Sequence, residues 1–328
     1  MKKSFVLIII PLLTLSFACK GKGEFFYQKF KQTRFLLGTY VTITIYAEKE
    51  PSHLFEKVFR EIKRISDKYS VEEENSYVNQ LCRKAFNGGT KVDEETAFLI
   101  RKSIEISRLI EGAFDITVAV LKKLWGFNLS PHLPEKDEIQ KALKKVGWKK
   151  IRLSGKFLEL PNGTFLDLSG IAKGYAIDRA VEILKKEGIK SALIDAGGDI
   201  YALGQKPDGK MWKIGIKHPR QKGLLKIVEL KNAAIATSGD YENFFISQGK
   251  RYHHIFNPAT GYPAPFCQSV SVITASALEA DALATGLFVA GPERAKILSR
   301  NLRITSFIVD KNGKLFIFDF SDSDLKYY

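Results

Sequence analysis

The alternation of apolar and polar residues first becomes regular at residues 35–46, in the run FLLGTYVTITIY. This alternation, together with the many β-branched side chains of the run, indicates one long strand. Residues 52–69 then change to a helical period, with apolar side chains at spacings of four, four, three and four: Leu54, Val58, Ile62, Ile65 and Tyr69. These positions form one face of a helix, so the pattern predicts a strand followed by an amphipathic helix.

The middle of the chain continues to mix the two periods. Asp93 is placed to cap a second helix that ends near Gly112, and a weaker helical period covers residues 136–147. Short strands are predicted around residues 150–160. Residues 164–204 then indicate a strand, an amphipathic helix and a second strand, which is the pattern of a βαβ unit.

The last third of the chain adds strands, two helices and a hairpin. The strands are expected at 211–216, 225–230 and 269–275, the helices at 278–290 and from Pro292 onward, and the hairpin turn at Asn312-Gly313. No internal repeat and no long linker interrupts the pattern. It predicts a mixed α and β fold of the α+β class, formed by residues 33–328 as a single globular domain, with two subdomains as the alternative organisation.

The N-terminal residues indicate an export signal. Two lysines precede an uncharged apolar run, FVLIIIPLLTLSFA, which is shorter than the roughly 20 residues that a spanning helix needs. A small residue directly before Cys19 resembles a bacterial lipoprotein cleavage site. We therefore expect residues 1–18 to be a lipoprotein-type signal peptide, Cys19 to carry the lipid, and residues 19–32 to form a tether. Simple secretion and an uncleaved anchor are the alternatives.

Composition and charge restrict the class of partner. Of the 328 residues, 45% are apolar, and 51 Lys and Arg stand against 36 Asp and Glu, which gives a net charge of +15. Loss of the signal peptide removes two lysines and leaves 49 − 36 = +13. Outside the cytoplasm this charge is attracted to anionic headgroups. We do not expect a nucleic-acid partner, because many lysines lie in helix-like runs that suit a solvated face, such as Lys141, Lys144 and Lys145.

The remaining cysteines, Cys82 and Cys267, do not have the spacing of a redox or metal motif. The sequence leaves open whether they pair or remain buried thiols. No cluster of His and Cys has the spacing of a zinc site.

Two segments combine acids, glycines and short connections. In residues 167–178 (DLSGIAKGYAID), Asp167 ends the expected strand and a helix begins at once, with Lys173 in its first turn. A helix N-terminus offers free N–H groups to a phosphate, and Lys173 adds a point charge; a tight connection with a surface lysine is the alternative. In residues 195–199 (DAGGD), the glycine pair lets the backbone approach a ligand, or simply makes a turn between strands.

A third segment, residues 237–261, contains two of the five histidines. His253 and His254 are adjacent, so on a strand their side chains point to opposite faces and only one can face a site. We take His254 as the candidate general base, titrating near the ordinary histidine pKa of about 6.5. Asp240 and Asp281 are the alternative bases, and a purely structural role in the strand is the competing interpretation.

The fourth segment is EADALATG, in which Asp281 and Thr285 are four residues apart and share one helix face. Carboxylate and hydroxyl oxygens suit Mg²⁺, which often takes one or two protein ligands together with phosphates and waters. A capping or helix–helix hydrogen bond is the alternative for this pair taken alone.

In their order along the chain, these segments resemble the FAD:protein FMN transferase family, the flavin transferases also called ApbE proteins. The resemblance spans about residues 33–320 and rests on seven ordered motifs: LLGTYVTITIYA, GAFDITVAVLKKLWGF, DLSGIAKGYAIDRA, DAGGDIYALG, ATSGDYENFF, HHIFNPATGYPA and EADALATGLFVAG.

The resemblance implies a mixed α/β, T-fold-related fold around a central FAD cleft. It implies Mg²⁺-dependent transfer of FMN from FAD to a Thr or Ser hydroxyl of an acceptor flavoprotein, such as a subunit of a membrane redox complex, with release of AMP. The FAD contacts it implies are Leu37, Gly38, Thr39, Glu74, Asn75, Ser76, Asp115, Asp167, Lys173, Ser238, Gly239 and Ile255. The implied metal ligands are the backbone of Gly170 with the side chains of Asp281 and Thr285.

Two other functions stay open at this point. If water replaces the acceptor hydroxyl, the same site is an FAD pyrophosphatase that yields FMN and AMP. A flavin-binding lipoprotein without chemistry is the other alternative, although such a carrier has no need for a metal pair or a base. The expected location is the cell membrane, through a lipid anchor, facing the periplasm or the exterior.

Overall fold

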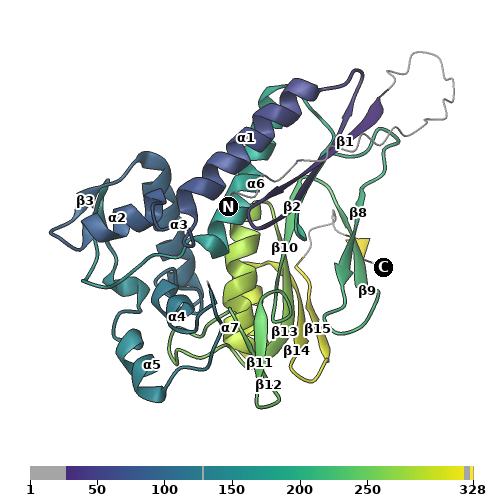
Figure 1. The fold of residues 1–328 in the computed structure, drawn as a ribbon. Helices are drawn as coiled ribbons and strands as arrows, with labels where there is room; N and C mark the ends of the chain where they lie inside the picture. The colour runs from purple at the N-terminus through teal and green to yellow at the C-terminus, as the bar shows by residue number, and fades with distance from the viewer. Residues whose placement is uncertain (1–26, 128, 321–325, 328) are drawn as a thin grey trace, which may run out of the picture.

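The structure is a computed structural model that describes residues 27–127, 129–320 and 326–327 (Figure 1). The expected signal peptide and Cys19 lie outside the described residues. The predicted tether is partly wrong, because Gln28 already begins a strand that pairs with the next one along its whole length. The folded unit therefore starts inside the segment that we expected to be a tether.

A central sheet of eight strands forms the body of the protein, and all of its neighbouring strands pair antiparallel (Figure 1). The spatial order is β1–β2–β6–β7–β10–β13–β14–β15. The strands are Gln28–Leu36 (β1), Thr39–Ala47 (β2), Ala192–Ala196 (β6), Asp199–Leu203 (β7), Ala233–Gly239 (β10), Cys267–Thr274 (β13), Thr305–Asp310 (β14) and Leu315–Phe318 (β15). The α+β class predicted from the sequence is confirmed.

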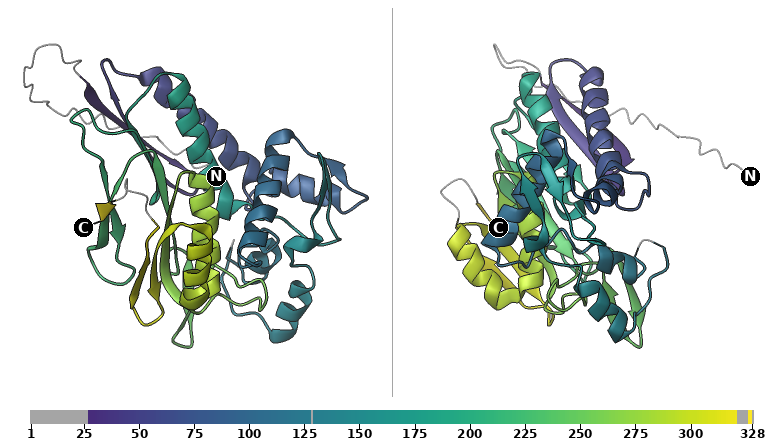
Figure 2. Two further views of the ribbon diagram at one scale, coloured as in Figure 1. Left: turned by 180° about the vertical axis from the view of Figure 1, so that it is seen from behind. Right: turned by 90° about the vertical axis from the view of Figure 1, so that its left-hand side faces the viewer.

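Three helices cover one face of this sheet (Figures 1 and 2): Ser52–Tyr69 (α1), Ser169–Lys186 (α6) and Ala277–Leu302 (α7). Their apolar sides join the largest core cluster together with the inward side chains of β2, such as Ile43 and Ile45. All five apolar positions that predicted α1 are buried. Burial of this stripe against the sheet holds the helix in place.

The opposite face of the sheet is covered by a smaller sheet of Trp212–Lys217 (β8), Leu224–Leu230 (β9) and Lys326–Tyr327 (β16). The side chains of Trp212, Ile214 and Val228 pack there against Ile235 and Phe307 of the central sheet.

A second group of short elements lies beside the helices, at the left of Figure 1. It contains Tyr77–Ala85 (α2), Thr90–Lys91 (β3), Glu94–Leu109 (α3), Ala119–Leu124 (α4), Lys136–Leu143 (α5), Trp148–Lys150 (η1), Arg152–Ser154 (β4) and Phe157–Glu159 (β5). The side chain of Asp93 caps α3 by accepting from the N–H of Thr96, as predicted. The hairpin of Phe244–Ser247 (β11) and Lys250–His253 (β12) packs on the aromatic cluster around Trp125.

The single strand predicted at residues 35–46 is two strands joined by a tight turn. Leu36 pairs with Thr39, and the two residues between them have positive φ angles of 55° at Leu37 and 71° at Gly38. A two-residue hairpin turn requires this backbone conformation, which costs little only at glycine. The alternation continues across the turn, so the period alone conceals it.

The predicted βαβ unit is wrong, because residues 164–168 form no strand. The backbone N–H groups there have scattered partners: that of Leu166 donates to the sulfur of Cys82, and that of Asp167 to the carbonyl of Ile116. Leu166 and Leu168 are fully buried, so their apolar pattern reflects burial rather than strand pairing.

Two later predictions are confirmed. The helical segment α7 is interrupted at Gly291, which has φ 77° and ψ 167°, directly before Pro292. Strands β14 and β15 form the C-terminal hairpin.

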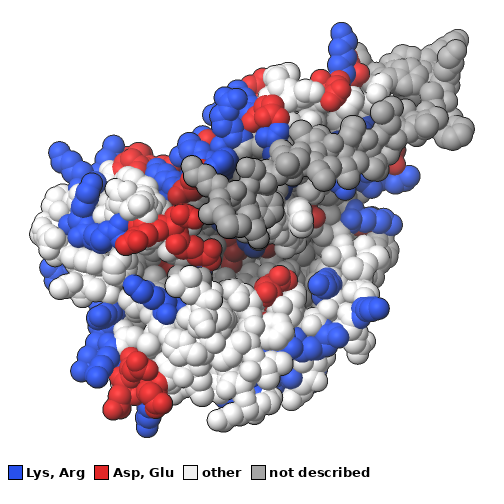
Figure 3. Space-filling view, in the orientation of Figure 1, with Lys and Arg blue, Asp and Glu red and all other residues white. Residues whose placement is uncertain are grey.

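Lys and Arg side chains are spread over the face shown in Figure 3 and are interspersed with Asp and Glu. Several lie in exposed ion pairs, such as Lys63 with Asp67 at 2.6 Å on α1. Cys82 and Cys267 are buried free thiols, and burial raises their pKa to about 11 and about 12. Among the helices in the described ranges, none is both long enough and apolar enough to cross a bilayer.

Candidate active site

A cavity of about 580 Å³ lies where the end of α1, the first turn of α6, the middle of α7 and the β1–β2 turn meet. Ligand sites are commonly concave and of this size. Most of the residues singled out from the sequence line it: Leu37, Gly38, Thr39, Asp115, Asp167, Gly170, Lys173, Ser238, Gly239, His254, Ile255, Asp281 and Thr285.

One predicted stretch does not line this cavity. Ser76 caps α2 through the N–H of Asn79, while the carbonyl groups of Glu74 and Asn75 accept from Arg83 and Gln80. Residues slightly earlier in the chain take this place. They form what we call the α1 wall: Ile65, Ser66, Tyr69, Ser70, Val71 and Glu72.

Asp167 lies just before α6 and hydrogen-bonds to the first residue of this helix. Its Oδ1 accepts from the N–H of Ser169 at 2.8 Å, and its Oδ2 lies 3.6 Å from the ammonium of Lys122 on α4. Burial raises the pKa of Asp167, but Lys122 and the Ser169 hydrogen bonds outweigh burial, so its pKa is lowered. The carboxylate is therefore ionised and anchors Lys122 in the cavity wall.

Lys173, near the start of α6, lines the cavity and is paired with a buried residue that the sequence analysis did not single out. Its Nζ lies 2.9 Å from Oδ2 of Asp199 on β7. Burial lowers the pKa of Lys173, but Asp199 and then Asp281 outweigh this and raise it, so the ammonium stays charged. Asp199 ends the DAGGD segment, which the sequence had marked only for its glycines.

Asp281 lies on α7 and lines the cavity beside α6. The two helices approach very closely at Gly174, which brings the Asp281 side chain next to the α6 backbone. A Cβ at Gly174 would lie 2.1 Å from the carbonyl oxygen of Ala277, so only glycine fits. The N–H of Gly174 donates to Oδ2 of Asp281 at 3.0 Å. Burial, followed by the charge of Asp199, raises the pKa of Asp281 to about 7.

The metal residues implied by the resemblance lie together. Thr285 is one helical turn after Asp281, and its hydroxyl lies 3.1 Å from that of Ser238 on β10. The backbone of Gly170 is also close to Thr285, because a Cβ built on Gly170 would lie 3.6 Å from Oγ1 of Thr285. These oxygens are hard ligands and fit a divalent cation of the Mg²⁺ type. Among the described residues, no group of three or more His, Cys, Asp and Glu is arranged as a metal site.

His254 follows β12 and faces the cavity, whereas His253 points into the core. Nε2 of His253 lies 2.9 Å from the carbonyl oxygen of Ala264, and its Nδ1 accepts from the N–H of Ile255. Nδ1 of His254 lies 3.2 Å from the carbonyl oxygen of Asn243. A carbonyl can only accept, so Nδ1 of His254 carries the proton and Nε2 has a free lone pair.

The pKa expected for His254 from the sequence is wrong. Burial and then the ammonium of Lys122 lower the pKa of His254 to about 4. The imidazole is therefore neutral at pH 7, which is the state that a general base needs.

Two other acids are held by their own partners. The carboxylate of Asp240 accepts from both terminal nitrogens of Arg220, at 2.7 and 2.5 Å, which removes it as an alternative base. Asp115 lines the cavity, but its oxygens accept from the N–H and hydroxyl of Thr117 and from the N–H of Trp148. Asp115 therefore fixes the shape of this wall.

Sequence reasoning missed four polar residues of the site: Lys122, Glu242 and Asn243, which line the cavity, and Asp199, which pairs with Lys173. Each belongs to one of the seven ordered motifs, which was the available signal. Their roles depend on partners distant in the chain, so the motifs could not assign them.

Known proteins resemble this chain in sequence and in structure. A sequence profile described as the ApbE family matches residues 37–308. The FAD:protein FMN transferase of Salmonella typhimurium is 35% identical over 259 residues, which is 74% of this chain and 74% of that protein. That of Treponema pallidum is 30% identical over 318 residues, 89% of this chain and 87% of that protein. The ApbE protein of Thermotoga maritima superposes with a TM-score of 0.83 at 39% identity, covering 88% of this chain and 97% of that one.

Proposed function

This chain belongs to the ApbE family, and from that membership we propose that it is an Mg²⁺-dependent FAD:protein FMN transferase. It moves the FMN part of FAD to a Thr or Ser hydroxyl of an acceptor flavoprotein and releases AMP. The observation that carries the proposal is the convergence of Asp281, Thr285, Lys173 and His254 on one cavity. This set supplies what phosphoryl-type transfer needs, namely charge neutralisation and positioning of the reacting groups.

The charges around Lys173 favour a divalent cation at this end of the cavity. Two buried carboxylates, Asp199 and Asp281, lie near one ammonium, that of Lys173, so ionising both leaves one negative charge uncompensated. This is why the pKa of Asp281 is raised, and a bound cation would compensate that charge. Asp281, Thr285 and the carbonyl group of Gly170 would hold the ion. When bound, Mg²⁺ supplies charge neutralisation for the pyrophosphate and polarises its phosphorus.

His254 takes the proton in the transfer step. The acceptor oxygen forms a bond to the FMN phosphorus while its O–H bond breaks, and the proton passes to Nε2 of His254. The bond from that phosphorus to the bridging oxygen breaks, and AMP leaves with the oxygen. Lys173 remains an ammonium beside the pyrophosphate, where its positive charge stabilises the negative charge that develops on the phosphate oxygens.

Incubation with FAD and Mg²⁺ tests the proposal, with and without a purified redox-complex subunit in its unmodified form, whose acceptor threonine still has a free hydroxyl. We expect an acceptor heavier by one FMN, together with an equal amount of AMP, by mass spectrometry and chromatography. Free FMN and AMP in both incubations would instead identify an FAD pyrophosphatase. Unchanged FAD would identify a flavin carrier and would contradict both enzymatic functions.

We also propose that the mature protein is anchored to the cell membrane by lipid on Cys19 and faces the periplasm or the exterior. The support is the charged, apolar and small-residue pattern before Cys19. This location is where a subunit of a membrane redox complex would meet the cavity.

A further inference from the structure

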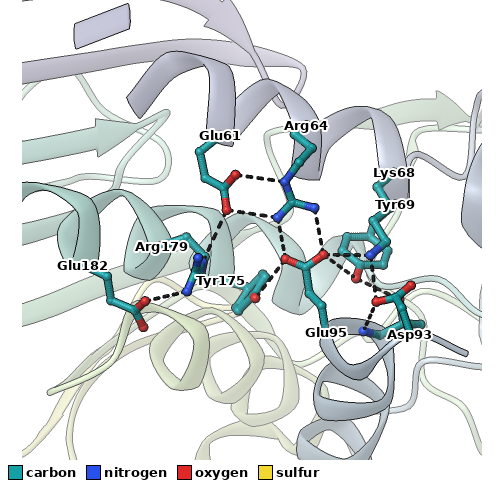
Figure 4. Close-up of polar contacts among 10 residues, drawn as sticks. Glu61, Arg64, Lys68, Tyr69, Asp93, Glu95, Tyr175, Arg179 and Glu182 are labelled. Carbon is teal, nitrogen blue, oxygen red and sulfur yellow. Dashed lines mark hydrogen bonds and ion pairs between the residues drawn. The ribbon is translucent and has the colours of Figure 1, made fainter. Parts of the chain in front are cut away.

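Glu95, at the start of α3, lies at the centre of a polar network that joins three helices (Figure 4). Its carboxylate accepts from both terminal nitrogens of Arg64, at 2.8 and 2.5 Å, and from Nζ of Lys68 at 2.7 Å. It also accepts from the hydroxyl of Tyr175 on α6 at 3.0 Å. Only 17% of the Glu95 side chain is exposed, so water competes little for these contacts.

Most of these contacts hold the last turns of α1 against the first turn of α3. Lys68 also pairs with Asp93 at 2.9 Å, and the hydroxyl of Tyr69 lies 3.0 Å from that of Thr96. Burial raises the pKa of Glu95, but Arg64 and Lys68 outweigh it and lower the pKa to about 2. The carboxylate is therefore charged at any pH at which the protein would work.

The end of α1 matters because it carries the α1 wall of the cavity. Tyr69 is the last residue of α1 and lines the cavity, and the wall continues through Glu72. The facing side, α6, is fixed in another way. Its Asp178 accepts from the hydroxyl of Ser276 and from the N–H groups of Ala277 and Leu278 at the start of α7. The Gly174–Asp281 contact adds to this, so α6 is held against α7 by contacts that do not involve Glu95.

We propose that Glu95 is a positioning residue for FAD: it holds the α1 wall at the separation from α6 that the bound dinucleotide requires. The inference rests on the proposed function, because it names FAD as the molecule that contacts the wall. The α1 wall contains neither the proposed base nor a proposed metal ligand. Its contacts with FAD are therefore the same before and during transfer, and losing them raises KM while kcat stays unchanged.

Glu95→Gln is the decisive variant, since it keeps the size of the side chain but removes the charge shared by Arg64 and Lys68. We expect KM for FAD and the Kd from flavin fluorescence titration to rise by about tenfold, with kcat within about twofold of wild type. Glu94→Gln is the matched control. Glu94 neighbours Glu95 on α3 and pairs with Arg101 at 2.7 Å and Lys156 at 3.0 Å, but its side chain is 63% exposed. We expect wild-type KM and Kd for this control.

A second pair of variants decides the question if Glu95→Gln does not fold. Lys68→Met removes a cation from the network, whereas Lys63→Met makes the same change on the same helix, where Lys63 pairs with Asp67 at the exposed surface. Only Lys68→Met should raise KM and Kd.

Two results would overturn the positioning role: equal FAD affinity for Glu95→Gln and Glu94→Gln, or a fall in kcat at unchanged KM. A wild-type protein that binds FAD but transfers no FMN would instead refute the proposed function, and the Kd comparison would still decide the role of Glu95.

Discussion

The carboxylate of Asp281 on α7 accepts a hydrogen bond from the backbone N–H of Gly174 on α6, at 3.0 Å. This contact places an acid of one helix against the second turn of another, near Lys173. It uses only one carboxylate oxygen: no described residue donates a hydrogen bond to Oδ1 of Asp281. The buried acid is therefore both fixed in position and available to a cation, and it is the residue on which the metal assignment depends.

Asp281→Ala should reduce transfer by roughly three powers of ten at ordinary Mg²⁺, because an ion in such a site supplies several kcal/mol to the transition state. Thr285→Ala should cost less, since a neutral hydroxyl is a weaker ligand than a carboxylate. Glu279→Ala, on the same helix with a side chain 43% exposed, is the control and should keep its rate. Steady-state kinetics over a Mg²⁺ titration measure all three, and full activity of Asp281→Ala would remove the metal assignment.

Asp281 should also make the metal-free protein less stable as the pH rises. Because burial and Asp199 raise the folded-state pKa of Asp281 from 3.8 to about 7, the folded protein holds this proton more tightly than the unfolded chain does. Protonated Asp281 therefore makes its full contribution to the free energy of unfolding below pH 3.8, and this contribution is lost as the pH rises through about 7.

The neutral variant Asp281→Asn tests this linkage by thermal unfolding in EDTA. Its Tm should exceed that of the wild type at pH 8, by about 3 °C for each kcal/mol recovered, and the difference should shrink at pH 5. Added Mg²⁺ should raise the Tm of the wild type only. Asp67→Asn at the exposed surface should behave as wild type at both pH values. An Asp281→Asn variant with the wild-type Tm at pH 8 would show that the ionised carboxylate of Asp281 does not destabilise the metal-free protein.

His254→Ala should slow single-turnover transfer by about 10² to 10⁴, which is the usual contribution of a general base, while FAD affinity is retained. With a pKa of about 4, the imidazole of His254 is neutral above pH 6. At saturating Mg²⁺, which keeps the proposed ligand Asp281 ionised, the wild-type rate should therefore be independent of pH above pH 6 and fall only as the pH approaches 4. A rate that rises through pH 6.5 under these conditions would mean that His254 has an ordinary histidine pKa and would contradict the lowered value.

His253→Ala is the matched comparison for His254→Ala. Its side chain is buried and hydrogen-bonded to Ala264 and Ile255, so we expect a lower Tm and a nearly unchanged rate. Loss of one buried polar partner typically costs about 1–3 kcal/mol of stability. If His253→Ala were the slow variant instead, the catalytic assignment would move to that residue.

Cys19→Ser should release the protein from membranes, because the lipid is the only anchor that we propose. Fractionation of cells that express each form, followed by detection of the protein in the membrane and soluble fractions, measures this. The transfer activity of the released variant should match that of the wild type with a soluble acceptor. Equal membrane retention of both forms would show that lipid on Cys19 is not the tether.

Several features follow from local sequence because they depend on neighbours a few residues away. The face of α1, the Asp93 cap of α3 and the break of α7 at Pro292 are set by side-chain period, capping chemistry and the missing N–H of proline. The i, i+4 spacing places Asp281 and Thr285 on one helix face whatever the rest of the fold does. The order of the motifs along the chain therefore identified most of the cavity residues.

The amino-acid order is enough to establish the family, the class of elements and the kinds of side chain available for chemistry. Which of these side chains meet depends on the packing of distant elements. The pairing of Lys173 with Asp199 and the low pKa of His254 both arise from residues brought together from separate parts of the chain. The α1 wall replaced the predicted residues 74–76 for the same reason. Periodicity reports only whether a position is buried, whereas partners, charges and desolvation arise when separate elements pack together.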